Sequence, residues 1–313
     1  MGQPASTFSS YDAVGNREDL SDIIYDISPT ETPFMSSIPK VSMTGTKHEW
    51  QKDALAAASS SNFVIEGDDA TTDAATATSR LYNYRAISDK VPRVTGTQEA
   101  VKKAGRASEM AYQMEKRMKE LKRDVEKILL ENNAYVVGTD TVASECAGAQ
   151  AWIKTNTSIA GDAVAATGDG SDAHTDGTAR ALQESFVETV LGNAWNSGGN
   201  PTMAILGKAQ KQAFASFSGN ATRTHSGETK KITNTIDIYI DPLGNEVRLV
   251  PDRFCPADVV YFFDPEMVAF ATLRDFQSSD LAKTGDSWQK QILVEYTLEM
   301  RNEAAHGGIY DLT

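Results

Sequence analysis

The chain has 313 residues, of which 40% are apolar and 23% are charged, and this composition is typical of a folded globular protein. Its length suits one large domain or two smaller ones. The net charge of −13 disfavours direct binding to nucleic acid, because a protein that grips phosphates needs an excess of Lys and Arg. An acidic protein can still surround DNA without adhering to it, since like charges repel.

The only cysteines are Cys146 and Cys255, which form neither a CxxC pair nor a disulfide framework. We expect two reduced thiols in a protein made in a cytoplasm. The first residues, MGQPASTFSSYDAV, lack a basic segment followed by an apolar run, so no signal peptide is expected. No stretch approaches the run of about 18 apolar residues that spans a bilayer, so we expect no membrane contact.

A loose polar tail, residues 1–15, is followed by a predicted short helix that begins at the N-cap Asn16. The Ser28-Pro29 step ends this helix, and residues 29–39 are expected to be extended. The apolar stripe of such a terminal helix must be buried on the body of the protein or on a neighbouring subunit. Four residues at i, i+3, i+4 and i+7 form the stripe and are predicted intersubunit contacts: Leu20, Ile23, Ile24 and Ile27.

Two mixed aromatic, β-branched and charged segments, residues 44–54 and 79–95, predict the strands of a long ribbon. Between them, 17 of the 24 residues from 55 to 78 are Ala, Ser, Thr or Asp, which cannot build a core. Such a tip is typical of disorder or of docking on a partner, and we favour docking. The predicted intersubunit contacts of this ribbon are Trp50, Phe63, Tyr82 and Tyr84.

The strongest helical pattern follows the ribbon. A short helix is expected over residues 97–104, and Ser108 is the predicted N-cap of a long helix that reaches about Asn132. On its wet side, ion pairs are expected between Glu115 and Lys119, Glu120 and Arg123, and Asp124 and Lys127. The predicted apolar stripe, which should pack on the late strands, comprises Ala111, Met114, Met118, Leu121, Val125, Ile128 and Leu129.

The second half of the chain mixes helices and strands. Loops with short strands are expected over 138–178, and a polar loop over 218–230. Helices are predicted over residues 179–195 and 208–217. Strands are predicted over 203–206, 236–240, 247–250, 259–263, 268–273, 292–300 and 309–312. A long helix first and strands last indicate an α+β fold in two linked subdomains.

Sequence motifs of enzymes and metal sites are incomplete. His48-Glu49 begins like HExxH, but Lys52 stands where the second histidine is required. The segment from Asp172 to Gly177 partly resembles a calcium loop, although Gln183 replaces the bidentate glutamate. A solvated acidic loop explains it better. We therefore expect no metal and no cofactor.

Motifs of catalytic residues are also incomplete or absent. Lys283-Thr284-Gly285 lies directly before Ser287-Trp-Gln-Lys290, whereas in penicillin-binding proteins the SxxK nucleophile lies far upstream of KTG. Neither GxGxxG nor a Walker loop nor GxSxG occurs. We expect no catalytic residues and no enzyme activity.

The order of the predicted parts resembles the major capsid proteins of tailed bacteriophages, whose fold is named after the Hong Kong phage. Specific strings are similar to a head-protein family long labelled a domain of unknown function. They lie in the arm (DLSDIIYDISPTETPF, 19–34), at EWQKD (49–53) and at LAKTGD (281–286). Other strings of this kind are EGDD (66–69), VTGT (94–97), ELKRD (120–124) and NE (302–303). The resemblance covers residues 16–313.

The resemblance implies five parts. These are an N-terminal arm (1–40), an extended β-hairpin loop (41–95), a spine helix of the peripheral domain (96–137), a mainly axial domain (138–257), and peripheral-domain strands with the C-terminus (258–313). It also implies hexamers and pentamers of one chain in an icosahedral shell around double-stranded DNA. The shell would assemble in the bacterial cytoplasm, with scaffolding, portal and decoration proteins as further partners.

Three other readings stay open at this stage. A bacterial nanocompartment shell of the encapsulin type shares the fold and would need a cargo-binding groove. A hydrolase would be a compact monomer with a ligand-filled cleft. A tail or decoration protein would be another part of the same virion.

Overall fold

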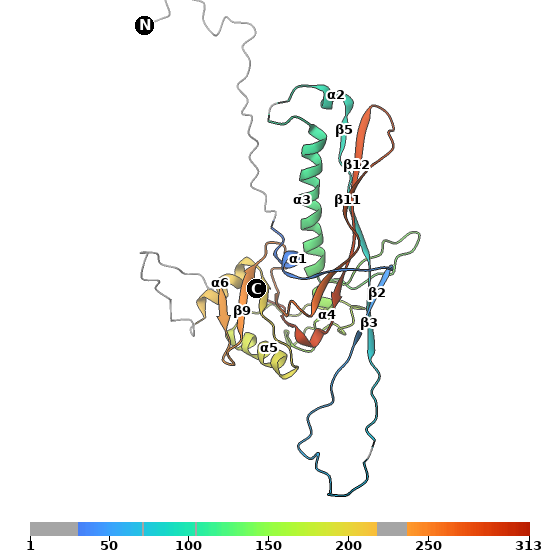
Figure 1. Cartoon of the computed structure of the whole chain (residues 1–313). Helices are drawn as coiled ribbons and strands as arrows, with labels where there is room; N and C mark the ends of the chain where they lie inside the picture. Colours follow the sequence, from blue (N-terminus) through green and yellow to red (C-terminus); the bar gives the residue numbers. More distant parts are fainter. Residues whose placement is uncertain (1–30, 71, 104, 218–236) are drawn as a thin grey trace, which may run out of the picture.

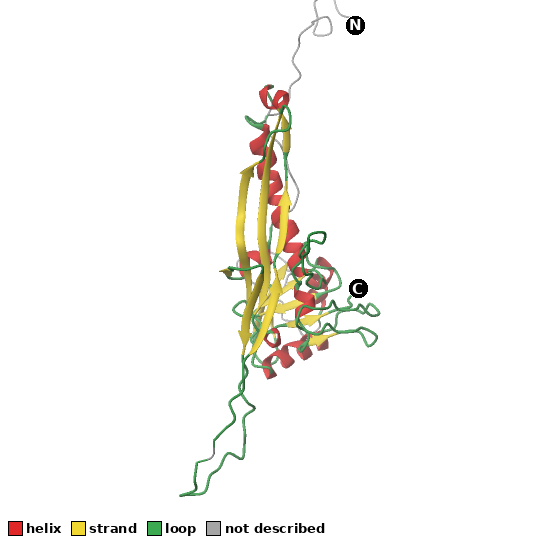
Figure 2. Ribbon diagram, turned by 90° about the vertical axis from the view of Figure 1, so that its right-hand side faces the viewer, coloured by secondary structure: helices red, strands yellow, loops and turns green. Residues whose placement is uncertain are grey.

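The computed structural model describes residues 31–70, 72–103, 105–217 and 237–313. Figure 1 shows an elongated molecule in which a long helix lies beside long strands, and a smaller lobe lies to one side of their lower ends. A thin loop projects from the lower end of the long strands (Figures 1 and 2). The predicted terminal helix, with Leu20, Ile23, Ile24 and Ile27, lies outside the described residues.

The helices of eight or more residues are α3 (Glu109–Leu130), α5 (Glu184–Asn196) and α6 (Lys208–Ser216). The shorter helices are α1 (Pro33–Ser37), α2 (Gly96–Ala100), α4 (Ala149–Trp152) and the 3₁₀ turn η2 (Glu303–Ala305). The strands of the first half are β1 (Lys40–Ser42), β2 (Lys47–Lys52), β3 (Ser79–Tyr84), β4 (Ala86–Lys90), β5 (Arg93–Thr95) and β6 (Thr157–Ser158). Those of the second half are β7 (Met203–Leu206), β8 (Ile238–Ile240), β9 (Glu246–Pro251), β10 (Val260–Phe263), β11 (Val268–Asp280), β12 (Ser287–Met300) and β13 (Gly307–Ile309).

The long sheet has the strand order β1-β11-β12-β4, and β5 also pairs with β12. Helix α3 packs along β12 and β4, as predicted for a buried stripe facing the late strands. Alternate residues of β12 from Ile292 to Met300 point toward the helix and are fully buried. At about 1.5 Å per residue, the 22 residues of α3 form a rod of roughly 33 Å.

The smaller lobe is built on a six-stranded sheet with the order β6-β13-β10-β7-β9-β8. Its second core joins α5 and α6 to this sheet through residues such as Val190, Leu191 and Phe214. Strands β10 and β13 belong here, so the segment 258–313 supplies strands to both sheets. The α+β class is confirmed.

The segments 33–37 and 79–95 differ most from the prediction. Residues 33–37 form helix α1 instead of extended chain, because Pro33 suits the first helical position and Glu126 accepts from the exposed N–H groups. The single predicted strand 79–95 is three strands. The chain leaves β2 at Arg85 to pair with β12, and Pro92, which has no N–H to donate, separates β4 from β5.

The spine helix α3 follows the prediction with small changes. Ser108 caps it by accepting from the N–H of Ala111, as expected. Ala111 is exposed and Met110 is buried in its place, because the first turn leans on α2. The Glu115–Lys119 pair is present at 2.7 Å. The expected pairs Glu120–Arg123 and Asp124–Lys127 are wrong. Glu120 pairs with Arg117, and Asp124 pairs with Lys90. Lys127 pairs with Glu131 instead.

The hairpin β11–β12 is longer than the sequence predicts. Strand β11 continues to Asp280 and β12 begins at Ser287, well beyond the apolar runs at 268–273 and 292–300. Residues 274–280 and 287–291 are mostly polar, so their strand character comes from the pairing of β11 with β12 and of β12 with β5. This hairpin carries the long sheet to the upper end of the molecule (Figure 1).

Candidate assembly surfaces

The ribbon β2–β3 is anchored to the body at its root. Asn83 is fully buried, and its side-chain amide donates to the carbonyl oxygens of Leu298 and Ala147 at 2.9 and 3.3 Å. In return, its side-chain oxygen accepts from the N–H of Ala147 at 3.0 Å. His48 Nε2 lies 2.7 Å from Glu299 Oε2 on β12. Although burial raises the pKa of Glu299, its bonds to His48 and Arg301 hold it below its ordinary value.

Aromatic side chains complete this root. The ring of Trp50 lies 5.4 Å from that of buried Trp152 on α4. Tyr82 and Tyr84 surround Tyr135, with ring centroids 5.6 and 5.2 Å away. Three residues predicted as intersubunit contacts thus have partners within their own chain, and their contacts with a neighbouring subunit stay a prediction.

Beyond the root, residues 53–78 form a tip that projects away from the body (Figures 1 and 2). Every described residue of this tip is exposed. Phe63, Val64 and Ile65 are 88%, 88% and 78% exposed, although apolar residues of this size are usually buried. A consecutive exposed apolar triplet indicates an interaction site.

The tip is also strongly acidic. It contains one Glu and four Asp but neither Lys nor Arg. The two flanking strands differ, since the ribbon root carries Lys47, Lys52 and Arg80. A partner of the tip must therefore offer an apolar surface near basic groups, because unpaired charges resist removal from water.

A second contact region lies where the N-terminal arm meets the spine helix. Glu126 on α3 is fully buried and accepts from the N–H of Phe34 at 2.6 Å and of Met35 at 2.8 Å. Burial raises the pKa of Glu126 to about 8, and the nearby carboxyl of Asp252 raises it further. Burial also raises the pKa of Asp252. Burial thus disfavours the charged form of both carboxyls, and Glu126 holds the base of the arm through its two backbone bonds.

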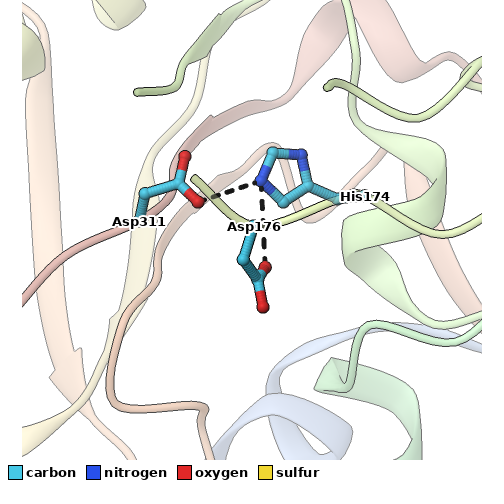
Figure 3. A group of neighbouring side chains, drawn as sticks. All are labelled: His174, Asp176 and Asp311. Carbon is cyan, nitrogen blue, oxygen red and sulfur yellow. Dashed lines mark hydrogen bonds and ion pairs between the residues drawn. The ribbon is translucent and has the colours of Figure 1, made fainter. Parts of the chain in front are cut away.

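One side-chain cluster among the described residues has the composition of a metal site (Figure 3). His174 Nε2 lies 3.3 Å from Asp311 Oδ1 and 4.0 Å from Asp176 Oδ1. Asp311 also accepts from the N–H groups of Ala160 and Gly177. Burial opposes ionisation of Asp311, but these bonds hold its pKa below the ordinary value.

The second ring nitrogen of His174 decides what this cluster does. Nδ1 is buried without a hydrogen-bond partner. A metal on Nε2 would place the proton on Nδ1, where no acceptor receives it, whereas metal-bound histidines almost always donate that proton. A ring that donates from Nε2 to Asp311 Oδ1 leaves only an acceptor, Nδ1, without a partner. The cluster therefore ties the C-terminal residues to the 160–178 loops, and the pairing with Asp311 could not be seen in sequence spacing.

The two thiols are both free and buried. Burial raises the pKa of Cys146 to about 12 and raises that of Cys255 well above its ordinary value. Thiols that stay protonated at neutral pH are poor nucleophiles. In the described parts of the chain, no helix has the length and apolar content needed to cross a bilayer.

The arrangement of ribbon, spine helix, long sheet and lobe is the fold of phage capsid subunits. It is similar to a chain of the Cyanophage A-1(L) capsid, with a TM-score of 0.68 and 11% identity over 97% of this chain and 98% of that one. It is also similar to a chain of Gordonia phage Cozz, with a TM-score of 0.60 and 10% identity over 98% and 96% of the two chains. A chain of the mature capsid of bacteriophage PhiM1 matches with a TM-score of 0.59 and 10% identity, over 99% of this chain and 96% of that one.

The chain belongs to the SU10 major capsid protein family, whose model matches residues 5–313. It is 29% identical to the major capsid protein of Escherichia phage Phieco32 over 345 aligned positions, which cover 99% of this chain and 98% of that protein. The function is therefore that of a bacteriophage major capsid protein, and the location is the capsid of the virion. The resemblance drawn from the sequence strings is confirmed.

Proposed function

We propose that this chain assembles with copies of itself into hexamers and pentamers, which form an icosahedral shell around double-stranded DNA. The observation that carries the proposal is the projecting tip. The described residues of 53–78 leave an anchored root, are all exposed, and include the apolar Phe63, Val64 and Ile65. A segment of this kind is useful only when another molecule covers it.

The net charge of the chain supports a shell subunit rather than a DNA-binding protein. With 43 acidic and 30 basic residues, the chain gains little from phosphate contacts. Packaged DNA would then be held by confinement, without sequence-specific binding. Scaffolding, portal and decoration proteins are further partners in this proposal.

The parts of the chain take distinct roles in the proposed assembly. Residues 1–40 form the arm, 41–95 reach the neighbour, and 96–137 give the peripheral domain its rigid spine. Residues 138–257 form most of the axial lobe, and 258–313 link the lobe to the long sheet. Among the predicted contacts that the structure describes, Phe63 is the most exposed, and Trp50, Tyr82 and Tyr84 hold the ribbon in the direction of the neighbour.

We also propose that the chain has no catalytic activity. Among the described residues, the one cluster with the composition of a metal site, His174 with Asp176 and Asp311, links the C-terminal residues to the 160–178 loops. The buried thiols stay protonated. The match to phage major capsid proteins favours a phage shell over the nanocompartment and the hydrolase that the sequence left open.

Electron microscopy of the purified chain, alone and with the scaffolding protein of the same phage, tests the assembly proposal. We expect closed shells or rings of five and six subunits. A variant that lacks residues 56–77 should stay a folded subunit and form neither. Monomers alone from the intact chain under both conditions would refute the proposal.

A further inference from the structure

Three parts of the chain meet at one pair of buried carboxyl groups. Glu126 lies near the end of the spine helix α3 and is 0% exposed, and Asp252 directly follows β9 and is 3% exposed. The arm reaches the same place, because α1 lies beside the lower end of α3 (Figure 1) and its Phe34 and Met35 N–H groups donate to Glu126. The pair therefore connects the arm, the spine helix and the smaller lobe.

The hydrogen bonds of the pair leave one oxygen without a donor. Glu126 Oε1 and Oε2 each accept from one N–H group of α1, and Asp252 Oδ1 accepts from the N–H of Phe254 at 2.9 Å. Asp252 Oδ2 is buried without a partner, although the carboxyl of Glu126 is a neighbour close enough to act on the pKa of Asp252. Two facing carboxyls can bond only when one of them carries a proton, because carboxylate oxygens accept but do not donate.

No basic side chain neutralises this pair. Within the described residues neither carboxyl forms an ion pair, so a second negative charge would be buried and unpaired. Burial raises the pKa of Glu126 to about 8, even though its bonds to two N–H groups favour the charged form. The other titratable groups of the surrounding elements are Glu31 of the arm, Arg123 and Glu131 at the spine helix, Lys208 of α6, and Arg253, Cys255 and Asp258 after β9.

A cavity lies between the base of the arm and the lobe. Its volume is about 650 Å³, and its wall includes Glu31 and Pro33 of the arm, Lys208 of α6, and Asp252 itself. The pair thus has a path to water that does not require the core to unfold. The base of the arm also borders open space on this side.

Apolar contacts hold the arm in place as well. Phe34 is fully buried with its ring 4.8 Å from that of Phe263, and Met35 and Ile38 are 6% and 5% exposed. These contacts do not depend on pH. A proton on the carboxyl pair can therefore shift an equilibrium between a docked and an open arm, but its loss does not remove every contact of the arm.

We propose that Glu126 and Asp252 form a proton-controlled latch for the arm. Residues 31–38 stay docked on α3 while the pair carries one proton, and they open from α3 when both carboxyls are charged. Opening returns Glu126 to water, so it releases the proton and is favoured as pH rises. Below this window both states hold the proton, and above it both have lost it, so the equilibrium is then constant. The latch belongs to the single subunit and does not rest on the proposed assembly.

Hydrogen exchange of the α1 amides in the free subunit measures this opening. Asp252→Asn is the reference, because its side chain keeps an acceptor for the Phe254 N–H and offers Glu126 an N–H that needs no proton. The ratio of the exchange rates of parent and variant at one pH removes the intrinsic pH dependence of exchange. For the amides of residues 34–38, we expect this ratio to rise by up to about tenfold per pH unit between about pH 5 and 8 and then to level off. A ratio that stays constant over this range would overturn the proposal.

Two Gln variants of α3 separate a latch from a merely structural contact. Glu126→Gln cannot gain a charge, so its α1 amides should show the same pH dependence as those of Asp252→Asn. Glu120→Gln is the matched control, because it removes a carboxylate of the same helix that pairs with Arg117, and it should keep the pH dependence of the parent. Equal pH dependence in the parent and in Glu126→Gln would also overturn the latch. If thermal melts show that Asp252→Asn does not fold, Glu126→Gln takes its place as the reference.

The outcomes separate this proposal from the proposed function. If the exchange ratio rises with pH but the unmodified chain forms neither shells nor rings, self-assembly is refuted and the latch stands. If shells form but the ratio is constant with pH, only the latch is overturned.

Discussion

Leu121 tests whether α3 is the structural spine of the molecule. Its side chain is 1% exposed and lies in the main core, on the helix face that packs on β12 and β4. Leu121→Ala removes buried methyl groups and leaves a cavity, which costs about 2–5 kcal/mol. A cooperative unit of 313 residues loses roughly 1.5 °C per kcal/mol, so the melting temperature should fall by about 3–8 °C.

Leu55→Ala is the matched control, because it makes the same chemical change at a residue that is 99% exposed. We expect it to change the free energy of unfolding by less than about 0.5 kcal/mol. Lys122→Ala, on the exposed side of α3, should also have a small effect, limited to its 5.8 Å contact with the Phe276 ring. Calorimetry of free subunits measures all three. Equal losses for Leu121→Ala and Lys122→Ala would mean that the buried face of the helix is misassigned.

Four more perturbations have defined outcomes. Replacing Ile23 and Ile24 together by Asp should lower particle yield more than the solubility of the subunit, and normal particles would refute a docked arm. Deleting residues 56–77 should leave the subunit's melting temperature unchanged while abolishing assembly. The folded pKa of Glu126, about 8, lies above its ordinary 4.5, so its contribution to stability is lost as pH rises through that window, and Glu126→Gln should flatten this decline in thermal melts. Burial lowers the pKa of His306 from 6.5 to about 4, so stability is lost as pH falls between those values, and His306→Gln should remove that loss.

The two pH effects oppose each other where their windows overlap, between 4.5 and 6.5, so they must be separated by variants. His306 is held neutral inside the protein, where Nδ1 accepts from the N–H of Asp264 and Nε2 donates to the carbonyl of Met267. Glu126 is held by two backbone N–H groups next to a second buried carboxyl. A double variant whose melting temperature still varies with pH as in the parent would assign the dependence to other groups.

Local patterns were sufficient to locate most elements. The i, i+3, i+4 spacing of α3 and its Ser108 cap are local features, since a helix forms its hydrogen bonds within one segment. The strands 236–240 and 247–250 were predicted from local patterns, and Gly244 in the turn between β8 and β9 adopts a positive φ of +88°. The order of parts and the strings along the chain also identified the capsid family.

Contacts between distant residues were not predictable in the same way. Helix α1 exists because Glu126, 92 positions away, accepts from its first N–H groups. The polar ends of β11 and β12 are strands because they pair with each other. No local pattern reveals that Met110 and Trp288 line one cavity.

The sequence by itself determined the class of fold, the spine helix, the low-complexity tip and the family, because periodicity, caps and composition are properties of neighbouring residues. Only the tertiary structure decided how the strands divide among the sheets, that His174 and Asp311 meet, and that the acidic tip projects away from the body. The physical reason is that these features depend on which distant segments the core brings together, and burial, pairing and hydrogen bonding across the core are not encoded in any single stretch of the chain.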